Sequence, residues 1–587
     1  MKIAFQAAKW YSSEKIWGRL YGEVLYVVLG ADLLLNALEE QGVDTVFGLP
    51  GGSVIPLYDR LKHFNIRHIL TRHEQGAVHA ADGYARATGK VGVCFATSGP
   101  GAANLVTGIA TAQMDSIPLV CITGQVVSSL LGKDSFQEAY TVGICQPVTK
   151  HAYAITDASQ IPDVIAEAFF VASTGRPGPV VIDIPKDMFS QDVVPPLESG
   201  KVRNRVAMKF KPYAVNKEQV KRAAKMWEAA EKPLLLVGGG VNNQERSREL
   251  LTELALRTNT PVTTTLMARG VFAEKSPLSL GMLGMHGTTA ANYATQHCDL
   301  LIAIGMRFDD RVTSVVETFA PNAKVIHVDI DPAEIGKNVA VDLPIVADSL
   351  EFLDALDDVM TTGQDKSAWL EEIASNTRTV KSAPTDALPP KETMEVLDGL
   401  LDENTIVVTD VGQHQMWAAL FLNPRRTRHF LTSGGLGTMG YGFPAAIGAQ
   451  FGQPDQTVVL ITGDGSFQMC MQELAVVKKF RLPIKICLMN NGYLGMVRQW
   501  QEMFHDGNYA ETTLDVAPDW QKLAEAYDIN YLRIANLDEC RDNLSKALSD
   551  KEPWLIDLKI DEGANVFPMV PAGCGLDDIV GEFENEA

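Results

Sequence analysis

The chain has 587 residues, of which 46% are hydrophobic and 21% are charged. This length exceeds what one hydrophobic core normally serves, and it predicts about three or four domains in a globular protein. Lys and Arg number 51 against 72 Asp and Glu, which gives a formal net charge of −21. Such a balance disfavours nucleic acid and anionic membranes as partners, although small anions can still bind where the local charge differs.

The cysteine and hydropathy patterns are those of a cytoplasmic protein. Eight cysteines are scattered without a Cys-x-x-Cys pair, which predicts reduced and mostly buried thiols. No apolar run reaches the roughly eighteen residues that a membrane span requires. Residues 1–28 lack the features of a signal peptide and are expected to form a peripheral extension. The first predicted helix covers residues 31–41 and ends at Gly42.

Apolar strands that end in Gly-rich or acidic turns recur at residues 91–96, 234–237 and 458–461. Each belongs to an alternation of strand and helix, which predicts parallel sheets covered on both faces. We therefore expect an α/β fold of three doubly wound parallel-sheet domains, separated by Pro- and charge-rich linkers. The predicted boundaries are 1–28 (extension), 29–190 (first domain), 191–212 (linker), 213–360 (central domain), 361–391 (linker), 392–555 (third domain) and 556–587 (C-terminal tail).

In the first domain, Glu74 follows a short predicted strand at 68–70 and opens a helix that runs to Arg86. A glutamate in the first helical turn is favoured by the helix dipole by about 0.3–1 kcal/mol, so its position alone requires no function. In the third domain, the strand 405–409 leads to Gln413 and His414. A Gly-rich turn at 432–440 then leads into another helix, and such turns allow backbone amides to approach a diphosphate.

The most specific pattern is the pair Asp464 and Asn491. Asp464 follows the predicted strand 457–462, Asn491 follows the strand 484–489, and one helix-length segment, 466–480, lies between them. A crossover of this length places both side chains at the carboxyl ends of parallel strands. A carboxylate and an amide oxygen suit Mg2+, which completes its shell with water and phosphate oxygens. The alternative is that both are ordinary turn residues.

This pair resembles the signature of thiamine diphosphate enzymes, and the resemblance extends from about residue 29 to 572. The chain is most similar to the catalytic large subunit of the acetohydroxyacid synthase (acetolactate synthase) family. The matching segments are 48–52 (GLPGG), 72–75 (RHEQ), 97–102 (TSGPGA), 114–118 (MDSIP), 136–138 (FQE), 173–187, 281–287 (GMLGMHG), 307–313 (RFDDRVT), 410–417 (DVGQHQMW) and 494–500 (LGMVRQW). The resemblance implies pyrimidine-binding, central FAD-binding and diphosphate-binding domains, in that order.

The same resemblance implies a reaction and three cofactors: thiamine diphosphate, Mg2+ and FAD. Pyruvate would be decarboxylated on thiamine diphosphate, and the two-carbon hydroxyethyl unit would be ligated to pyruvate or 2-ketobutyrate. The products would be 2-acetolactate or 2-aceto-2-hydroxybutyrate, intermediates of branched-chain amino-acid biosynthesis. A homodimer or a dimer of dimers is implied, together with a separate small regulatory subunit.

Catalytic and metal-binding roles carry over residue by residue. Glu74 would hydrogen-bond the pyrimidine N1′ of a cofactor held by another subunit, as general acid–base catalysis of proton removal requires. Gln137 would be a hydrogen-bonding partner at the active centre. Asp464 and Asn491, with the backbone carbonyl of Tyr493, would bind Mg2+.

Further residues would contact the cofactors. Gln413 and His414 would contact the diphosphate, Gly437 would offer its carbonyl to the 4′-amino group, and Met439 would support the bent cofactor. The remaining expected contacts are Gly51 and Gly465 for thiamine diphosphate, and Arg176, Gly238, Gly239, Gly240, Asp310 and Asp329 for FAD. The spacing of these glycines differs from the usual dinucleotide fingerprint, so FAD is expected only from the resemblance.

The acceptor 2-ketoacid carries a carboxylate, and Arg311 resembles its anchor, because a guanidinium fork matches that anion. Trp500 resembles the residue that favours 2-ketobutyrate, since an added methylene in an apolar pocket is worth about 1–3 kcal/mol. Phe136, Met285 and Lys186 would line the same channel, with Lys186 counted among the catalytic residues and Met285 among the cofactor contacts. The alternatives are an intra-helix ion pair for Arg311 and a half-buried core position for Trp500.

There are two alternatives to the carboligase function. A flavin-dependent pyruvate oxidase shares all three domains, but Arg311 and Trp500 serve an acceptor ketoacid and favour the carboligase. A non-enzymatic regulatory or scaffold paralogue is disfavoured, because Glu74, Asp464 and Asn491 are all present.

Overall fold

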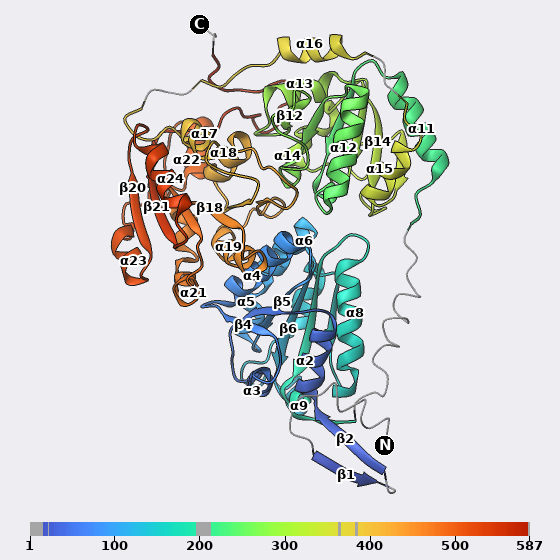
Figure 1. The fold of residues 1–587 in the computed structure, drawn as a ribbon, viewed down its shortest axis with the longest axis vertical. Coiled ribbons are helices and arrows are strands. Elements are labelled where there is room, and N and C mark those ends of the chain that lie inside the picture. Colours follow the sequence, from blue (N-terminus) through green and yellow to red (C-terminus); the bar gives the residue numbers. More distant parts are fainter. Residues whose placement is uncertain (1–15, 21–22, 195–212, 362–364, 382–384, 585–587) are drawn as a thin grey trace. The chain divides into compact units, whose positions relative to one another are not determined.

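The computed structural model describes residues 16–20, 23–194, 213–361, 365–381 and 385–584. Within these ranges it contains three six-stranded sheets, in each of which every paired strand is parallel, and one small three-stranded sheet (Figure 1). Helices lie in most of the connections between the parallel strands of each sheet. The predicted α/β fold with three parallel-sheet domains is confirmed.

The four inner strands of the first sheet are buried throughout, as expected for a parallel sheet covered on both faces, whereas its two edge strands are mostly half-buried or exposed. Its strand order is β4-β3-β5-β6-β8-β7. The strands are β3 (Thr45–Gly48), β4 (Arg67–Leu70), β5 (Gly92–Ala96), β6 (Leu119–Gln125), β7 (His151–Ala154) and β8 (Pro179–Pro185). The helices around it are α2 (Gly30–Glu40), α3 (Ile55–Leu61), α4 (Glu74–Thr88), α5 (Pro100–Asn104), α6 (Val106–Asp115), α7 (Thr141–Cys145), α8 (Ile161–Ser173) and α9 (Lys186–Ser190).

The second sheet has the order β12-β11-β10-β13-β14-β15. Its strands are β10 (Pro233–Val237), β11 (Val262–Thr264), β12 (Ser279–Met282), β13 (Leu300–Ile304), β14 (Lys324–Asp329) and β15 (Leu343–Val346). The accompanying helices are α11 (Lys217–Ala229), α12 (Glu245–Thr258), α13 (Thr289–His297), α14 (Asp310–Thr313), α15 (Ser349–Asp357) and α16 (Ser367–Ser375).

The third sheet has the order β17-β16-β18-β19-β21-β20. Its strands are β16 (Thr405–Thr409), β17 (Phe430–Leu431), β18 (Thr457–Gly463), β19 (Lys485–Asn490), β20 (Asn530–Ile534) and β21 (Trp554–Lys559). The helices of this region are α17 (Pro390–Asp398), α18 (Gln413–Phe421), α19 (Gly442–Gly452), α20 (Asp464–Gln468), α21 (Leu474–Phe480), α22 (Gly495–Phe504), α23 (Trp520–Ala526) and α24 (Cys540–Ser549).

Each large sheet has one point where the chain reverses the direction in which it adds strands. These points lie between β3 and β5, between β10 and β13, and between β16 and β18. The loops after such strand pairs diverge and leave a crevice at the carboxyl edge, where open α/β sheets bind ligands. The topology therefore predicts three crevices, one for each sheet.

Contacts divide the chain into two compact units. The first comprises residues 1–212, 435–454 and 470–482, and the second comprises 213–434, 455–469 and 483–587. In the first unit, α19 packs closely on α4: a Cβ at Gly448 would lie 1.8 Å from the Ala80 carbonyl oxygen, and one at Gly83 would lie 2.0 Å from that of Ala445. Only glycine permits such an approach of two helix backbones.

Several elements differ from the sequence prediction. Two strands, β1 (Ile16–Leu20) and β2 (Glu23–Leu29), precede the first helix, and β2 pairs with the short strand β9 (Asp192–Val193). The segment 466–480 is not one helix, because Cys470 leaves helical geometry at φ −139°. It divides instead into α20, a turn of 3-10 helix and α21.

Two segments expected to lie outside the domains contribute to the core. Residues 361–391, predicted to be a linker, contain α16, whose Trp369 is buried. In the predicted tail, Met569, Val570 and Phe583 are buried. Residues 195–212 of the first predicted linker and residues 1–15 and 21–22 of the predicted extension lie outside the described residues.

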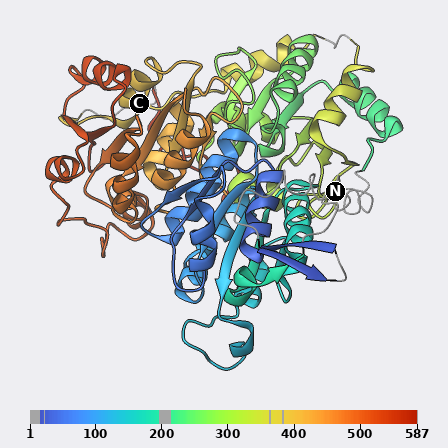
Figure 2. The ribbon, with the colours of Figure 1, turned by 60° about the horizontal axis from the view of Figure 1, so that its bottom comes forward.

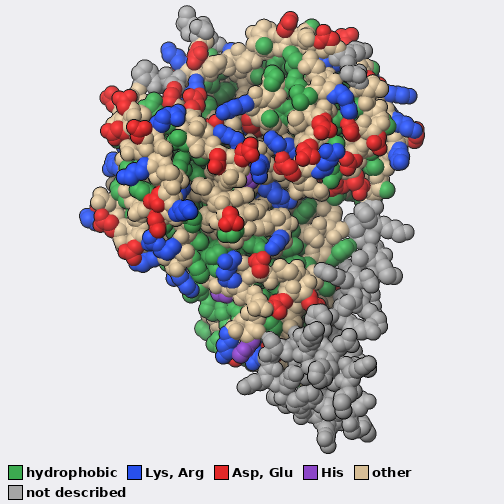
Figure 3. Space-filling model, viewed as in Figure 1, with side chains coloured by type: hydrophobic (Ala, Val, Ile, Leu, Met, Phe, Trp, Pro, Cys, Tyr) green, Lys and Arg blue, Asp and Glu red, His purple; other side chains and the backbone are tan. Residues whose placement is uncertain are grey.

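The surface has interspersed charges and one loop with exposed apolar side chains. Acidic and basic side chains are interspersed over the face shown in Figure 3. The loop that follows β6 extends away from the first sheet (Figure 2) and carries the exposed side chains of Leu130, Leu131, Phe136 and Tyr140. None of the helices in the described ranges combines the length and the apolar character that crossing a membrane would require.

Candidate functional site

The predicted metal ligands lie at neighbouring strand ends of the third sheet. Asp464 follows β18 directly, Asn491 follows β19, and the two strands pair in parallel through Gly463 and Met489. Asp464 Oδ2 accepts a hydrogen bond of 3.0 Å from the backbone N–H of Gly492. The structure therefore brings the Asp464 carboxylate to the residue next to Asn491, as the spacing predicts.

The Asp464 carboxyl is buried, and this burial raises its pKa to about 6, against the opposing effect of backbone N–H groups such as that of Gly492. A cation beside it would favour the charged form and offset the cost of burial. Within the described ranges, no group of three or more His, Cys, Asp or Glu side chains is placed to hold a metal. A cation here would need amide, carbonyl, water or phosphate oxygens, which is the donor set that Mg2+ accepts.

Asn491 is oriented by its neighbours. Its Nδ2 donates to Gln413 Oε1 at 3.2 Å, and its Oδ1 accepts from the Tyr493 backbone N–H at 3.1 Å. A carbonyl oxygen has two lone pairs, so this oxygen can accept one more partner. The donor set of Asp464, Asn491 and the Tyr493 backbone thus fits the metal that the sequence predicts.

His414 belongs to the first turn of α18, which follows β16, and its ring lies beside Gly463 at the end of β18. It is fully enclosed, and burial lowers its pKa to about 3, so the ring is neutral. A Cβ at Gly463 would lie 2.9 Å from its Nδ1, and one at Gly412 would lie 2.9 Å from its Cε1. Its Nε2 has no hydrogen-bond partner among the described residues. A buried polar atom of this kind fits a site whose ligand, such as a phosphate oxygen, would accept its hydrogen bond.

The Gln413 side chain is committed to protein partners. Its Nε2 donates to Gln499 Oε1 and to the Ala564 carbonyl, both at 2.9 Å, while its Oε1 accepts from Asn491. Its position at the start of α18 leaves its backbone N–H in the first helical turn, where phosphate groups commonly bind. A diphosphate contact from Gln413 is therefore more compatible with its backbone than with its amide.

In the first unit, the predicted residues Glu74, Gly51 and Gln137 gather around the turn after β5. Glu74 is buried in the first turn of α4. A Cβ at Gly101 would lie 3.3 Å from Glu74 Oε1, a Cβ at Gly51 would lie 2.6 Å from the Thr97 side chain, and one at Gly99 would lie 2.8 Å from the Gln137 carbonyl oxygen. This turn follows β5 at the reversal point of the first sheet, where the topology predicts a crevice.

The segment that contains Gly437 and Met439 belongs to the same unit. It leads from a turn into α19, as predicted, and Gly437 has a φ of 69°. Tyr441 Oη donates to Asp82 Oδ1 on α4 at 2.9 Å, and the Gly435 N–H donates to Asp115 Oδ1 at 2.7 Å. These contacts hold the segment against α4, the helix that Glu74 opens, and against the end of α6.

The residues predicted to contact FAD follow strands of the second sheet, apart from Arg176. Gly238 directly follows β10, Asp329 is the last residue of β14, and Asp310 begins α14 after β13. The Gly240 N–H donates to the Gly305 carbonyl at 2.9 Å, and a Cβ at Gly238 would lie 2.2 Å from Met306 Cβ. Close packing between the two loops therefore explains these glycines without a ligand. Arg176 lies in the first unit, where its Nε donates to Ser116 Oγ at 2.8 Å.

The predicted acceptor residues meet in the second unit. The Arg311 guanidinium lies 5.9 Å from the centroid of the Trp500 indole, and its Nη1 lies 3.4 Å from Met285 Sδ. The alternative ion pair also exists, since Arg311 Nη1 lies 3.9 Å from Asp310 Oδ2, but both side chains are largely exposed, which makes such a pair weak. Trp500 is 37% exposed, so one face of its indole remains accessible.

The other two predicted channel residues belong to the first unit. Phe136 is 88% exposed in the loop after β6. Lys186 begins α9 after β8, which is separated from β5 by β6 in the sheet. The strand order thus places Lys186 away from the Glu74 turn within this unit.

Comparison with known proteins identifies the family. The sequence matches the models described as thiamine pyrophosphate enzyme N-terminal TPP binding domain over residues 29–144, central domain over 220–356 and C-terminal TPP binding domain over 410–558. It is 49% identical over 564 residues to a Methanocaldococcus jannaschii protein named "Probable acetolactate synthase large subunit", with 94% of this chain and 95% of that protein covered. The chain belongs to the acetolactate synthase large-subunit family.

Other members of this family are similar over nearly their whole length. The acetolactate synthase large subunit of Corynebacterium glutamicum is 48% identical over 568 residues, which cover 94% of this chain and 90% of the relative. Acetolactate synthase 1, chloroplastic, of Nicotiana tabacum is 45% identical over 576 residues, with 95% and 86% covered. The predicted family and its class, a thiamine diphosphate-dependent transferase, are confirmed, and the pyruvate oxidase alternative is not favoured.

The structure adds residues that the sequence prediction omits. Asn104 Nδ2 donates to Glu74 Oε2 at 2.9 Å and fixes that carboxylate. Glu473 accepts hydrogen bonds from the backbone N–H groups of Arg72, at 2.8 Å, and of His73, at 3.1 Å, just before Glu74. Asn104 lies shortly after the matched segment 97–102 but is not part of any motif. Glu473 is separated from Arg72 by 401 residues in the sequence. No local sequence signal relates either residue to Glu74.

The Glu473 carboxyl gives a prediction about pH. Its side chain is buried, and burial raises its pKa to about 7 from an ordinary value of 4.5. Between these values the folded protein holds a proton that the unfolded chain releases, so stability falls as pH rises and levels off above about pH 7. At about 1.4 kcal/mol per pKa unit, the loss approaches about 3 kcal/mol. Glu473→Gln should remove this dependence.

The measurement is the free energy of unfolding in urea for both proteins, from about pH 5 to about pH 8. The stability of Glu473→Gln relative to the wild type should increase up to about pH 7 and then level off. A constant difference between the two proteins would show that Glu473 does not titrate there.

Proposed function

We propose that the chain catalyses the acetolactate synthase reaction with pyruvate as donor and pyruvate or 2-ketobutyrate as acceptor. One observation carries the proposal. The second unit holds both the Asp464–Asn491 donor set for a metal-bound diphosphate and an exposed guanidinium, that of Arg311, 5.9 Å from the centroid of the Trp500 indole. A diphosphate site alone would fit many thiamine enzymes, whereas a cation beside an aromatic face suits an acceptor that is both anionic and partly apolar.

Cofactor binding in the second unit would divide between metal and backbone contacts. Thiamine diphosphate, when bound, supplies the reactive carbon to which pyruvate adds. Asp464, Asn491 and the Tyr493 carbonyl would hold Mg2+ on the diphosphate. His414 Nε2 and backbone N–H groups of the first turns of α18 and α20, including those of Gln413 and Gly465, would contact the diphosphate oxygens.

The first unit would supply the acid–base group. Glu74 would hydrogen-bond the pyrimidine N1′ and stabilise the proton there, with Asn104 holding the carboxylate in place. Gln137 and Gly51, which lie against the turn after β5, would border the active centre. Gly437 would offer its carbonyl to the 4′-amino group, and Met439 would support the bent cofactor. In this family assignment the two parts come from different subunits, so we propose at least a homodimer.

For the acceptor, Arg311 would bind the carboxylate and Trp500 would cover the alkyl group. Met285, in contact with Arg311, would extend this apolar wall. Phe136 and Lys186 would line the route to it, and the 88% exposure of the Phe136 side chain leaves it available for this contact.

Replacing the indole should alter specificity more than turnover. Trp500→Leu should lower the ratio of 2-aceto-2-hydroxybutyrate to 2-acetolactate by roughly 5- to 100-fold, because the extra methylene of 2-ketobutyrate loses its apolar contact. The measurement is product analysis at equal concentrations of the two acceptors. Val497→Ala, which changes another exposed apolar residue of α22, serves as the control. An unchanged ratio in Trp500→Leu would make Trp500 a packing residue.

We further propose that FAD binds at the reversal point of the second sheet. The support is positional: Gly238, Gly239 and Gly240 follow β10, and Asp310 and Asp329 follow the next two strands, at the carboxyl edge where dinucleotides bind. Arg176 would contribute from the first unit. The purified protein should then carry visible flavin absorbance, and Asp329→Ala should reduce the flavin content.

The function itself is tested by product analysis with pyruvate alone and with added 2-ketobutyrate. We expect 2-acetolactate in the first case and a mixture with 2-aceto-2-hydroxybutyrate in the second. Reduction of the flavin by pyruvate under anaerobic conditions, without any condensation product, would contradict the proposal. The same experiment therefore also examines the oxidase alternative.

The domain boundaries, location and partners complete the proposal. We retain 29–190, 213–360 and 392–555 as the pyrimidine-, FAD- and diphosphate-binding domains, because each contains one parallel sheet apart from the last residues of β21. The eight cysteines are free, which supports a cytoplasmic location. A dimer or a dimer of dimers and a separate small regulatory subunit follow from the family.

The regulatory subunit gives a further prediction. Purified alone, the chain should be active but nearly insensitive to valine, because feedback requires an effector site coupled to the active site and we place that site on the small subunit. Adding the cognate small subunit should raise activity and introduce inhibition. The measurement is activity against valine concentration with and without that subunit. Strong inhibition of the isolated chain would place the effector site on this chain.

A further inference from the structure

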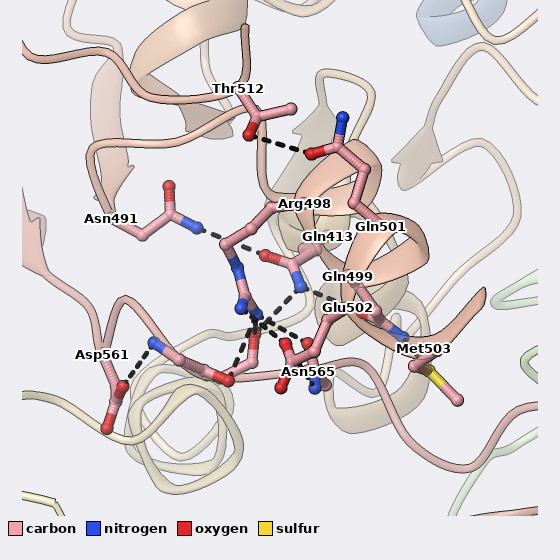
Figure 4. Close-up of polar contacts among 12 residues, drawn as sticks. Gln413, Asn491, Arg498, Gln499, Gln501, Glu502, Met503, Thr512, Asp561 and Asn565 are labelled. Carbon is pink, nitrogen blue, oxygen red and sulfur yellow. Dashed lines mark hydrogen bonds and ion pairs between the residues drawn. The ribbon is translucent and has the colours of Figure 1, made fainter. Parts of the chain in front are cut away.

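Three buried side-chain amides are connected in series in the second unit: Gln499, Gln413 and Asn491 (Figure 4). Gln413 Nε2 donates to Gln499 Oε1 at 2.9 Å, and Asn491 Nδ2 donates to Gln413 Oε1 at 3.2 Å. The far end of the series is fixed to the backbone of Val566. The Val566 N–H donates to Gln499 Oε1 at 2.8 Å, and Gln499 Nε2 donates to the Val566 carbonyl at 3.1 Å.

The hydrogen bonds of this series can run in only one direction. A backbone N–H and C=O cannot exchange places, so Val566 determines which end of the Gln499 amide is the oxygen. That oxygen requires a donor, so Gln413 must present its Nε2, which the Ala564 carbonyl also accepts at 2.9 Å. Gln413 Oε1 then faces Asn491 and requires its Nδ2. The Asn491 oxygen is left on the opposite side, and reversing any one amide would place two donors or two acceptors against each other.

Space around the series is restricted as well. A Cβ at Gly495, the first residue of α22, would lie 2.1 Å from Gln413 Oε1 and 2.7 Å from Asn491 Nδ2. Gly495 does not have a positive φ, so alanine can adopt its backbone conformation. The requirement for glycine therefore comes from the two amides beside it.

We propose that Gln499 is a positioning residue that acts through Gln413 to keep the Asn491 amide oxygen available to Mg2+. This inference rests on the proposed metal site. Gln499 is fully buried and its hydrogen bonds reach only protein groups, so it contributes orientation rather than a ligand. Without it, Gln413 keeps one of its two acceptors and Asn491 samples the reversed orientation, in which its Nδ2 faces the cation.

The first test is Gln499→Met, which preserves length and lies beside the sulfur atoms of Met503 and Met569. Mg2+ is titrated calorimetrically into the protein in the presence of saturating thiamine diphosphate. We expect a loss of roughly 10- to 100-fold in Mg2+ affinity, as is usual when the partner of a metal ligand is removed. At saturating Mg2+ the turnover should recover, because no ligand is missing.

Gln501→Met is the matched control. Gln501 lies on the same helix, and its amide also pairs with one backbone residue: Nε2 donates to the Ala510 carbonyl at 2.9 Å, and Oε1 accepts from the Ala510 N–H at 3.3 Å. Among the described residues, Thr512 is the only one whose side chain hydrogen-bonds the Gln501 amide, at 3.2 Å. No hydrogen bond in this part of the chain connects Gln501 to Asn491. Its Mg2+ affinity should match that of the wild type. An equal loss in both variants would overturn the proposal and assign the effect to α22 as a whole.

Gly495→Ala places a methyl group against the Gln413 and Asn491 amides without removing a polar group. It therefore tests the proposal even if Gln499→Met does not fold. Alanine favours the helix, so stability without metal should be retained, whereas Mg2+ affinity should fall by a similar roughly 10- to 100-fold. Wild-type affinity in a folded Gln499→Met or Gly495→Ala protein would overturn the inference. Asp464→Ala tests the proposed metal site separately from the positioning role of Gln499. If this variant keeps its Mg2+ affinity, the metal site itself is wrong.

Discussion

Glu74→Gln should slow exchange of the thiamine C2 proton by about 10²- to 10⁴-fold, the range that one acid–base group usually contributes. The Glu74 carboxylate has one oxygen held by Asn104, at 2.9 Å, and the other beside Gly101. In the variant the amide oxygen can still accept from Asn104. The amide nitrogen then takes the second position, where it cannot stabilise a protonated pyrimidine N1′. Binding of the cofactor should change much less than the exchange rate.

The measurement is deuterium incorporation at C2 in the protein loaded with thiamine diphosphate and Mg2+. Glu40→Gln makes the same chemical change at the exposed end of α2 and should exchange at the wild-type rate. Asn104→Ala should fall between the two, because it loosens the carboxylate without removing it. Wild-type exchange in Glu74→Gln would exclude Glu74 from proton removal.

The parts of the site that the sequence predicted are those governed by local rules. Asp464 and Asn491 each follow an apolar run of strand length, and parallel neighbouring strands bring their carboxyl ends to one edge. The same rule places Glu74 after β4 and the 97–101 turn after β5. In these cases the strand pattern determines where a side chain lies, so residue type and spacing suffice.

The parts that escaped prediction depend on contacts between distant segments. Glu473 meets the backbone before Glu74 across 401 residues. Gln499 reaches Asn491 only through Gln413, and Gln499 is itself held by the backbone of Val566, 67 positions further on. No periodicity or motif encodes such pairs. The residue type of a glycine is ambiguous for the same reason: the close approach of Met306 is enough to require glycine at position 238, so the glycine alone does not indicate a phosphate contact. FAD, too, was expected from family resemblance and not from spacing.

Asp464→Ala should abolish Mg2+-dependent binding of thiamine diphosphate, with a loss of at least about 100-fold in affinity. Removing an outer partner of a metal ligand typically costs 10- to 100-fold, and Asp464 is the only carboxylate in the proposed ligand set. Burial already raises its pKa to about 6, so the pocket provides little to stabilise a charge except a cation. Asp464→Asn keeps an oxygen but loses the charge, and should therefore lie between the alanine variant and the wild type.

The measurement is calorimetric titration of thiamine diphosphate with and without Mg2+. Asp455→Ala removes an exposed carboxylate near the opposite, amino end of β18 and should leave affinity unchanged. The metal-free stability of Asp464→Ala should rise, because a buried carboxylate without its cation destabilises the fold at neutral pH. A variant that is more stable without metal yet unable to bind the cofactor would separate the ligand role of Asp464 from any structural one. Undiminished Mg2+-dependent affinity would instead show that the strand-end pair does not hold the diphosphate.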